Sequence, residues 1–131
     1  MPGRSTAVSN GQGLQKAVVE LATGLGLECQ IEVKVGRRIW GPQRRIDVVL
    51  TDPGSKLKLG LECKYQGTTG TAEEKIPSTI EDIKAWPIRG LVVIEGPGFS
   101  GNMRGFLIAT GTVVEFGDLA DWLRLYFSIE T

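Results

Sequence analysis

The pattern of apolar and polar residues is most regular from Lys56 to Tyr65, where the two kinds alternate over ten consecutive positions. Such an alternation is typical of a β-strand that buries one of its faces. It predicts a strand over residues 56–66, in which Glu62 and Lys64 are neighbours on the polar face. The apolar positions, which are expected to face the core, are Leu57, Leu59, Leu61, Cys63 and Tyr65.

A second apolar run lies just before this strand, at residues 45–51, and it contains the carboxylate of Asp47. The intervening Asp-Pro-Gly-Ser sequence at 52–55 is a strong turn signal. A hairpin through this turn would place the Asp47 carboxylate beside that of Glu62. We therefore interpret Asp47, Glu62 and Lys64 as a triple around which the chain is built.

Apolar residues that recur every three or four positions predict amphipathic helices elsewhere in the chain, and further apolar runs predict strands. The predicted helices span residues 13–25, 72–86, 101–109 and 118–127, and the other predicted strands span 28–35, 89–95 and 112–116. Pro77 falls inside the second helix, which is therefore expected to be kinked or to begin after it. The run at 89–95 is almost wholly apolar, which indicates a central strand covered on both faces.

The lengths of the connections predict how the strands pair. Short turns join the first three strands and favour antiparallel neighbours, whereas helices precede the fourth and fifth strands and favour parallel neighbours. The predicted fold is therefore α/β, with a mixed five-stranded sheet flanked by helices on both faces and the order α-β-β-β-α-β followed by α-β-α. Residues 1–10 are expected to be a flexible tail, and residues 11–131 a single domain.

The composition excludes several classes of protein. The chain has 131 residues, 41% of them apolar, which is enough for one domain with a hydrophobic core. No apolar run approaches the roughly 20 residues that cross a bilayer, and the polar N-terminus has no apolar signal region, so we expect a cytoplasmic protein without membrane contact. The absence of histidine rules out Ser-His-Asp and Cys-His catalysis. The two cysteines, Cys29 and Cys63, lie among apolar neighbours and are expected to be free thiols.

The charges are unevenly distributed along a chain of zero net charge. Residues 1–66 contain ten Lys and Arg against six Asp and Glu, a net charge of +4, whereas residues 67–131 carry a net charge of −4. The densest basic cluster comprises Arg37, Arg38, Trp40, Arg44 and Arg45. Arginine forks bind phosphate and a tryptophan ring can stack on a base, so this cluster is a candidate nucleic-acid contact. An ordinary basic hairpin tip is the alternative.

Two carboxylates on neighbouring strands, here Asp47 and Glu62, can hold a hard divalent cation, with Mg²⁺ or Mn²⁺ the expected ion. The main-chain carbonyl of Cys63 and water molecules would complete the oxygen shell. Such a cation polarises a phosphodiester and lowers the pKa of a bound water, while Lys64 can stabilise the negative charge that develops. Glu20, on the first predicted helix, is a candidate third carboxylate. A solvated helix carboxylate is the alternative interpretation of this residue.

The hairpin and its flanking elements resemble the core of the PD-(D/E)XK nuclease superfamily. The resemblance rests on segments 44–50 and 61–66, together with the order of helices and strands over roughly residues 10–95. One departure is that Ile46 stands where the superfamily's name has a proline, at a position that varies among its members. The resemblance implies a restriction-endonuclease-like fold and the metal-dependent hydrolysis of phosphodiester bonds.

The resemblance also implies roles for the matching residues. Asp47 and Glu62 correspond to the two metal-binding, catalytic carboxylates of the superfamily, and Lys64 corresponds to its lysine. Glu20 matches the acidic residue that is often found on the first helix. These four residues are therefore the expected catalytic set.

Other candidates lie outside the triple. Gln66, at the end of the Glu-x-Lys strand, and Lys75, at the start of the next helix, are candidate nucleic-acid contacts. The C-terminal helix carries Trp122, Tyr126 and Phe127, which we interpret first as core residues. The second interpretation is a homodimer contact, because a small nuclease that cuts duplex DNA often needs two active sites.

The leading hypothesis is a Mg²⁺-dependent endonuclease that hydrolyses phosphodiester bonds of duplex or branched DNA. The alternative is a catalytically silent nucleic-acid-binding or assembly module on the same fold, against which the intact triple argues. A third interpretation treats the triple as a coincidental charge ladder. It would leave the carboxylate of Asp47 in an apolar strand without purpose, and burying an unpaired carboxylate is costly.

Overall fold

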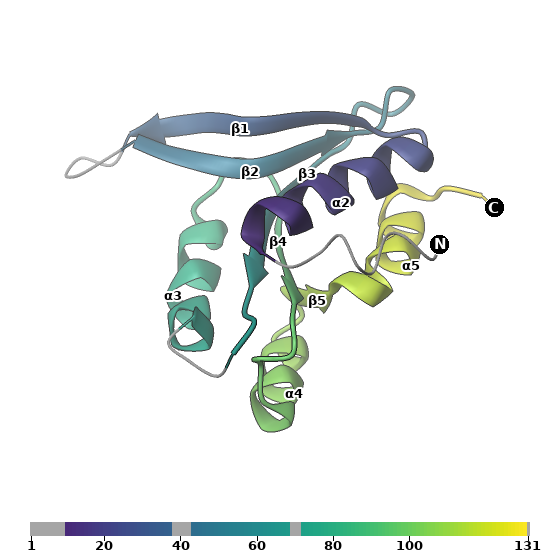
Figure 1. The fold of residues 1–131 in the computed structure, drawn as a ribbon. Helices are drawn as coiled ribbons and strands as arrows, with labels where there is room; N and C mark the ends of the chain where they lie inside the picture. The colour runs from purple at the N-terminus through teal and green to yellow at the C-terminus, as the bar shows by residue number, and fades with distance from the viewer. Residues whose placement is uncertain (1–9, 38–42, 69–71, 131) are drawn as a thin grey trace.

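The computed structural model describes residues 10–37, 43–68 and 72–130, which form nine helices and strands within these ranges (Figure 1). The helices are α2 (Gly11–Gly24), α3 (Ala72–Lys84), α4 (Gly101–Ala109) and α5 (Phe116–Phe127). The strands are β1 (Glu28–Arg37), β2 (Gln43–Thr51), β3 (Lys58–Tyr65), β4 (Gly90–Glu95) and β5 (Val113–Glu115). The predicted element order is confirmed. The N-terminal tail expected at 1–10 lies outside the described residues except for Asn10.

The five strands form one sheet in the order β1-β2-β3-β4-β5. Strands β1, β2 and β3 pair antiparallel, whereas β4 pairs parallel with both β3 and β5. The predicted hairpin turn forms as well: the Asp52 side chain accepts the Gly54 N–H at 3.0 Å, and the Asp52 carbonyl accepts the Lys56 N–H at 2.8 Å. The antiparallel meander and the two parallel crossovers predicted from connection lengths are thus confirmed.

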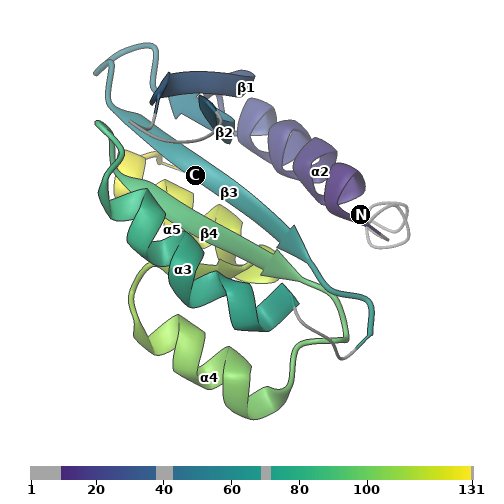
Figure 2. The ribbon, with the colours of Figure 1, turned by 90° about the vertical axis from the view of Figure 1, so that its left-hand side faces the viewer.

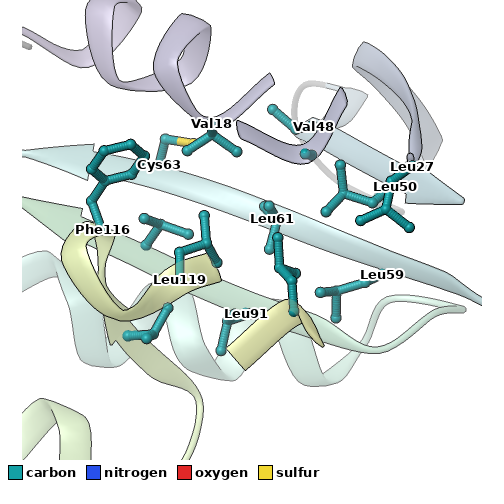
Figure 3. Close-up of a cluster of buried hydrophobic side chains, with 14 of the residues drawn as sticks. Val18, Leu27, Val48, Leu50, Leu59, Leu61, Cys63, Leu91, Phe116 and Leu119 are labelled. Atoms are coloured by element: carbon teal, nitrogen blue, oxygen red, sulfur yellow. The ribbon is translucent and has the colours of Figure 1, made fainter. Parts of the chain in front are cut away.

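Helices cover both faces of the sheet, as predicted. Helices α2 and α5 pack on one face and α3 and α4 on the other (Figures 1 and 2). The α2–α5 core contains Val18, Leu61, Leu91 and Leu119 among its buried side chains (Figure 3). The α3–α4 core comprises Ile76, Ile80, Ile83, Val92, Ile94, Phe99, Leu107 and Val113. Successive residues of β4 alternate between the two cores, which explains its continuous apolar sequence.

Strand β3 is also central, which corrects the expectation that its polar face is open to solvent. On that face Gly60 is buried, and the Glu62 side chain is only 19% exposed. The strand is shorter than predicted, since it begins at Lys58. Leu57 therefore precedes the strand and is 41% exposed, instead of facing the core.

The helix boundaries differ from the predictions by a few residues. Helix α2 begins earlier because the Asn10 side chain caps it by accepting the Gly13 N–H at 2.7 Å. Helix α3 includes Pro77 instead of starting after it, and α5 begins at Phe116, directly after β5. None of the helices in the described ranges is long and apolar enough to span a membrane.

The aromatic side of α5 packs against its own sheet. Phe127 is buried, Trp122 and Tyr126 pack on the α2–α5 core, and the Tyr126 hydroxyl lies 3.3 Å from the Lys58 carbonyl that accepts its hydrogen bond. The first interpretation of these aromatic residues, as core residues, matches the structure. Trp122 and Tyr126 stay partly exposed, and the homodimer contact of the second interpretation stays a prediction.

Candidate active site

The β2–β3 hairpin positions the two central carboxylates. Its ladder pairs Thr51 with Lys58 and continues as far as Val48 and Leu61, so that Asp47 and Glu62 are the next opposite positions. Side chains at opposite positions of an antiparallel pair lie on the same face of the sheet. Beyond this point a side chain replaces the main chain as hydrogen-bond acceptor, because Asp47 Oδ2 accepts the Cys63 N–H at 2.9 Å. The predicted proximity of Asp47 and Glu62 follows from this register.

Lys64 completes the group on the same face of β3. Its Nζ lies 3.4 Å from Glu62 Oε2, and the two side chains are 35% and 19% exposed. The other carboxylate oxygen, Glu62 Oε1, is buried and has no hydrogen-bond partner within the described part of the chain. Lys64 therefore compensates only part of the charge of Glu62.

The electrostatics of the pair reflect this incomplete compensation. Burial, followed by the charge of Asp47, raises the pKa of Glu62 to about 7, although Lys64 opposes the shift. Burial also raises the pKa of Asp47, against the lowering effects of the Cys63 N–H and Lys64, and the Glu32 carboxylate adds a further raising effect. The two carboxylates are thus held together at a cost in free energy.

This donor set fits a hard divalent cation. Carboxylate oxygens are the ligands that Mg²⁺ and Mn²⁺ prefer, and a cation would neutralise both charges and provide a partner for the orphaned Glu62 Oε1. The Cys63 carbonyl is oriented compatibly. The N–H and C=O of a strand residue point to the same side, and the Cys63 N–H points toward Asp47. Asp47, Glu62 and the Cys63 carbonyl are therefore suited to hold the metal.

A cavity of about 250 Å³ opens beside the carboxylates, between the sheet and α3. On the sheet side the cavity is lined by Arg45 of β2 and by Glu62 and Lys64 of β3. From the helix side it is lined by Thr79, Asp82, Ile83 and Trp86, the last in the turn that follows α3. The apolar pattern of residues 72–86 gives no sign that Ile83 and Trp86 lie at the site. Only the docking of α3 over the polar face of β3 brings them there.

Glu20 does not join this group. Helix α2 packs on the opposite face of the sheet through Leu14, Ala17, Val18 and Ala22. A residue two positions beyond Val18 lies on the far side of a helix with 3.6 residues per turn, and Glu20 is accordingly exposed. Among the described residues, no three His, Cys, Asp or Glu side chains gather as a metal site.

Gln66 also differs from its predicted role as a nucleic-acid contact. Its side chain is only 4% exposed, and Nε2 donates to the Gly98 carbonyl at 2.8 Å. Its main chain binds Glu95 O and Gly98 N. Gln66 therefore fixes the turn after β4 to the end of β3, because a buried amide requires these partners.

The predicted basic cluster is only partly visible. Arg45 lines the cavity, is 56% exposed and pairs with Glu32 at 3.6 Å. Arg37 and Arg44 lie in the main chain of β1 and β2, but their side chains, together with Arg38 and Trp40, lie outside the described residues. Lys75 is exposed on α3 and is not one of the residues that line the cavity.

Two solved structures have a similar fold, and a third aligns less well. AF1548, a protein of unknown function, aligns with a TM-score of 0.52 and 18% identity over 77% of this chain and 54% of its own. VC1899 from Vibrio cholerae aligns with a TM-score of 0.59 and 14% identity over 91% of this chain and 34% of its own. A repair endonuclease from Pyrococcus abyssi aligns with a TM-score of 0.45 and 10% identity over 82% of this chain and 46% of its own. The chain thus spans about half the length of AF1548 and a third of that of VC1899.

Sequence comparison assigns the family. A search of curated proteins gives no significant match. The model of the PD-(D/E)XK nuclease superfamily domain, however, matches residues 6–112, which include the whole hairpin and both of its carboxylates. The chain therefore belongs to the PD-(D/E)XK nuclease superfamily.

Proposed function

We propose that this chain is a metal-dependent deoxyribonuclease that hydrolyses phosphodiester bonds of DNA as an endonuclease, with Mg²⁺ or Mn²⁺ as its cofactor. The observation that carries the proposal is the pair Asp47 and Glu62, held at opposite positions of a hairpin with one buried carboxylate oxygen unpartnered. Burial raises the pKa of both groups, which is typical of a functional site. Membership of the superfamily supports the same chemistry.

The residues of the site have different roles, which follow from their positions. Asp47, Glu62 and the Cys63 carbonyl would hold the cation, which supplies Lewis-acid polarisation of the phosphodiester and a bound water of lowered pKa. Lys64, at the edge of the cavity, is placed to stabilise the negative charge that develops on the phosphate oxygens. Its present partner is Glu62, so a bound cation would free the ammonium group for the substrate.

The charge distribution supports a phosphodiester of nucleic acid as the substrate. The half of the chain with net charge +4 carries both carboxylates, and Arg45 stands at the cavity beside them. A guanidinium binds phosphate oxygens in a bidentate manner. We propose duplex or branched DNA as the substrate on this basis.

The test is cleavage of supercoiled plasmid, linear duplex and branched DNA with Mg²⁺, with Mn²⁺ or with EDTA. Wild type is compared with Asp47→Asn and Lys64→Met. Asp121→Asn and Lys84→Met are matched controls, because they remove the same groups from exposed helix positions that do not line the cavity. Metal-dependent cutting should be lost by at least about a hundred-fold in the site variants, as is typical when a group that stabilises transition-state charge is removed.

The controls should cut like wild type. Cutting that persists in EDTA, or in Asp47→Asn, would contradict the proposed site. DNA binding without any cutting by wild type would instead favour a catalytically silent nucleic-acid-binding or assembly module on this fold.

A further inference from the structure

The cavity beside the carboxylates has two chemically different walls. Arg45 and Lys64 place cations on the sheet side, whereas Ile83 and Trp86 form an apolar and aromatic surface on the helix side. Asp82 adds a carboxylate on the helix side. Cations suit the phosphates of a nucleic acid, and an aromatic surface suits a base. The proposed hydrolysis of DNA uses the sheet side and leaves the helix side without a role.

Trp86 packs against the sheet at a position where two neighbouring strands have no side chains. Gly60 of β3 and Gly90 of β4 are paired in register, and the indole lies over both. A Cβ atom added at Gly60 would lie 2.8 Å from Trp86 Cζ3, and one added at Gly90 would lie 2.1 Å from Ile83 Cγ2 and 2.8 Å from Trp86 Cε3. Glycine within a strand lowers the stability of the strand. The close approach of the indole explains why two opposite glycines are nevertheless present here. The edge of the ring is thereby fixed against the sheet.

Core packing alone does not account for the position of Trp86. Trp86 packs at the margin of the α3–α4 core, yet it stays only partly buried and forms part of the cavity wall next to Glu62. A fixed aromatic ring beside a phosphate-cleaving site is a stacking surface for a nucleobase, because every base presents a π-face.

Arg45 is available to hold the backbone of such a nucleotide. Its side chain is 56% exposed, and its contact with Glu32 is long, at 3.6 Å. Exposed ion pairs of this kind contribute little to stability, so a phosphate can displace Glu32 at small cost. The cation and the ring thus line the same cavity as Glu62, Arg45 from the sheet side and Trp86 from the helix side.

We propose that this cavity is a nucleoside subsite that receives one unpaired base next to the scissile phosphate, with Trp86 as its stacking surface. The inference rests on the proposed function and specifies its substrate class. A base inside an intact duplex is stacked on both faces and must leave the stack to reach such a ring. The preferred substrates are therefore single strands, frayed ends and junctions, where a base is already free.

The experiment changes the substrate and the protein together. The preferred cut is first mapped in a junction with a single-stranded arm, and the nucleotides beside the cut are then replaced one at a time by abasic residues. KM and kcat are measured for wild type, Trp86→Leu, Trp86→Phe and Trp122→Leu. Trp122 is the matched control, because it is also a partly buried tryptophan but packs on the opposite face of the sheet.

In wild type, one abasic replacement should raise KM by about ten- to a hundred-fold, the usual effect of losing one stacked base, with little change in kcat. Trp86→Leu should raise KM as much on the intact substrate and lose nothing further on the abasic one. Trp86→Phe and Trp122→Leu should resemble wild type. Equal cutting of paired and unpaired DNA, with no abasic effect, would overturn the subsite while leaving the nuclease function in place.

A binding measurement separates this inference from the cleavage activity. Replacing Trp40 and Trp122 by Phe leaves Trp86 as the sole tryptophan, since the chain has three. A single-stranded oligonucleotide in EDTA should quench Trp86 fluorescence, and an abasic oligomer of equal length should not. If wild type cuts no DNA, the proposed function fails, but the fluorescence measurement still decides the inference. Quenching by the base-containing strand alone supports the subsite, and any other result overturns it.

Discussion

At the residue scale, the carboxylates of the site lower the stability of the folded protein. Glu62 is buried, one of its oxygens has no partner among the described residues, and Lys64 at 3.4 Å compensates only part of its charge. The Asp47 carboxylate raises the pKa of Glu62 further. A buried carboxylate that is incompletely paired costs free energy, and such groups concentrate at functional sites.

The raised pKa of Glu62 predicts an unusual pH dependence of stability without metal. The folded protein holds this proton up to about pH 7, whereas the unfolded chain releases it near 4.5. The folded state therefore binds more protons in this window, and the free energy of unfolding should fall as pH rises from about 4.5 to about 7 and then level off. The upper limit of the loss is roughly 3 kcal/mol at about 1.4 kcal/mol per pKa unit.

Urea unfolding in EDTA at pH 5 and pH 8 measures this effect. Glu62→Gln, which removes the titrating group and keeps the shape, should lose most of the decline. Glu81→Gln, on an exposed position of α3, should keep it. A wild-type protein that is more stable at pH 8 than at pH 5 would contradict the raised pKa.

The same pair predicts stabilisation by divalent cations. A cation that binds only the folded state raises the free energy of unfolding by about 2.7 kcal/mol at a hundred times its Kd. Because the ligands must be deprotonated, the rise in Tm with Mg²⁺ or Mn²⁺ should be larger at pH 8 than at pH 6. Asp47→Asn combined with Glu62→Gln should abolish this rise, and Asp121→Asn should leave it intact. An equal rise in the double variant would place the cation elsewhere.

Strand register explains which site residues were predictable from the sequence. The side chains of Asp47, Glu62 and Lys64 share a face because strand alternation and a tight turn fix them locally. Glu20 and Gln66 depend instead on how α2 and the turn after β4 dock. Helical periodicity places Glu20 away from the buried residues of α2, but it does not show which face of the sheet this helix covers. No local pattern shows that Gln66 is buried.

At the element scale, α3 has the greatest effect on the site. It lies over the polar face of β3, which the alternating pattern indicated as open, and so turns a flat surface into a cavity. The order and pairing of strands were predictable, because connection lengths restrict them. The docking of α3 was not, because it depends on the absence of side chains at Gly60 and Gly90, which only the paired strands bring together.

This dependence predicts opposite effects for two Gly→Ala changes. A Cβ atom at Gly90 would overlap Ile83 and Trp86, so Gly90→Ala should lower the free energy of unfolding by about 1–3 kcal/mol. Gly105 is exposed within α4 and has open space around its Cβ position, so Gly105→Ala should raise the free energy of unfolding by about 0.5–1 kcal/mol. Urea unfolding of both variants tests the pair. A neutral Gly90→Ala would show that α3 can move away from the sheet without cost.

At the scale of the whole molecule, a chain of zero net charge has no general attraction for nucleic acid. Binding then depends on where single cations lie. Arg45 stands on the cavity side of the sheet, whereas Arg124 belongs to α5 on the opposite face and pairs with Asp121 at 3.1 Å. The two arginines carry the same charge and differ in location, which makes them a matched pair.

The salt dependence of DNA binding should distinguish them. Each phosphate neutralised by a cation contributes about −0.9 to the slope of log K against log salt concentration for duplex DNA, because it releases condensed counterions. Arg45→Gln should therefore make the slope less negative by about 0.9, and Arg124→Gln should leave it unchanged. Fluorescence anisotropy with labelled duplex in EDTA, over a series of salt concentrations, measures both. Equal changes in the two variants would mean that overall charge governs binding, and that Arg45 contacts no phosphate.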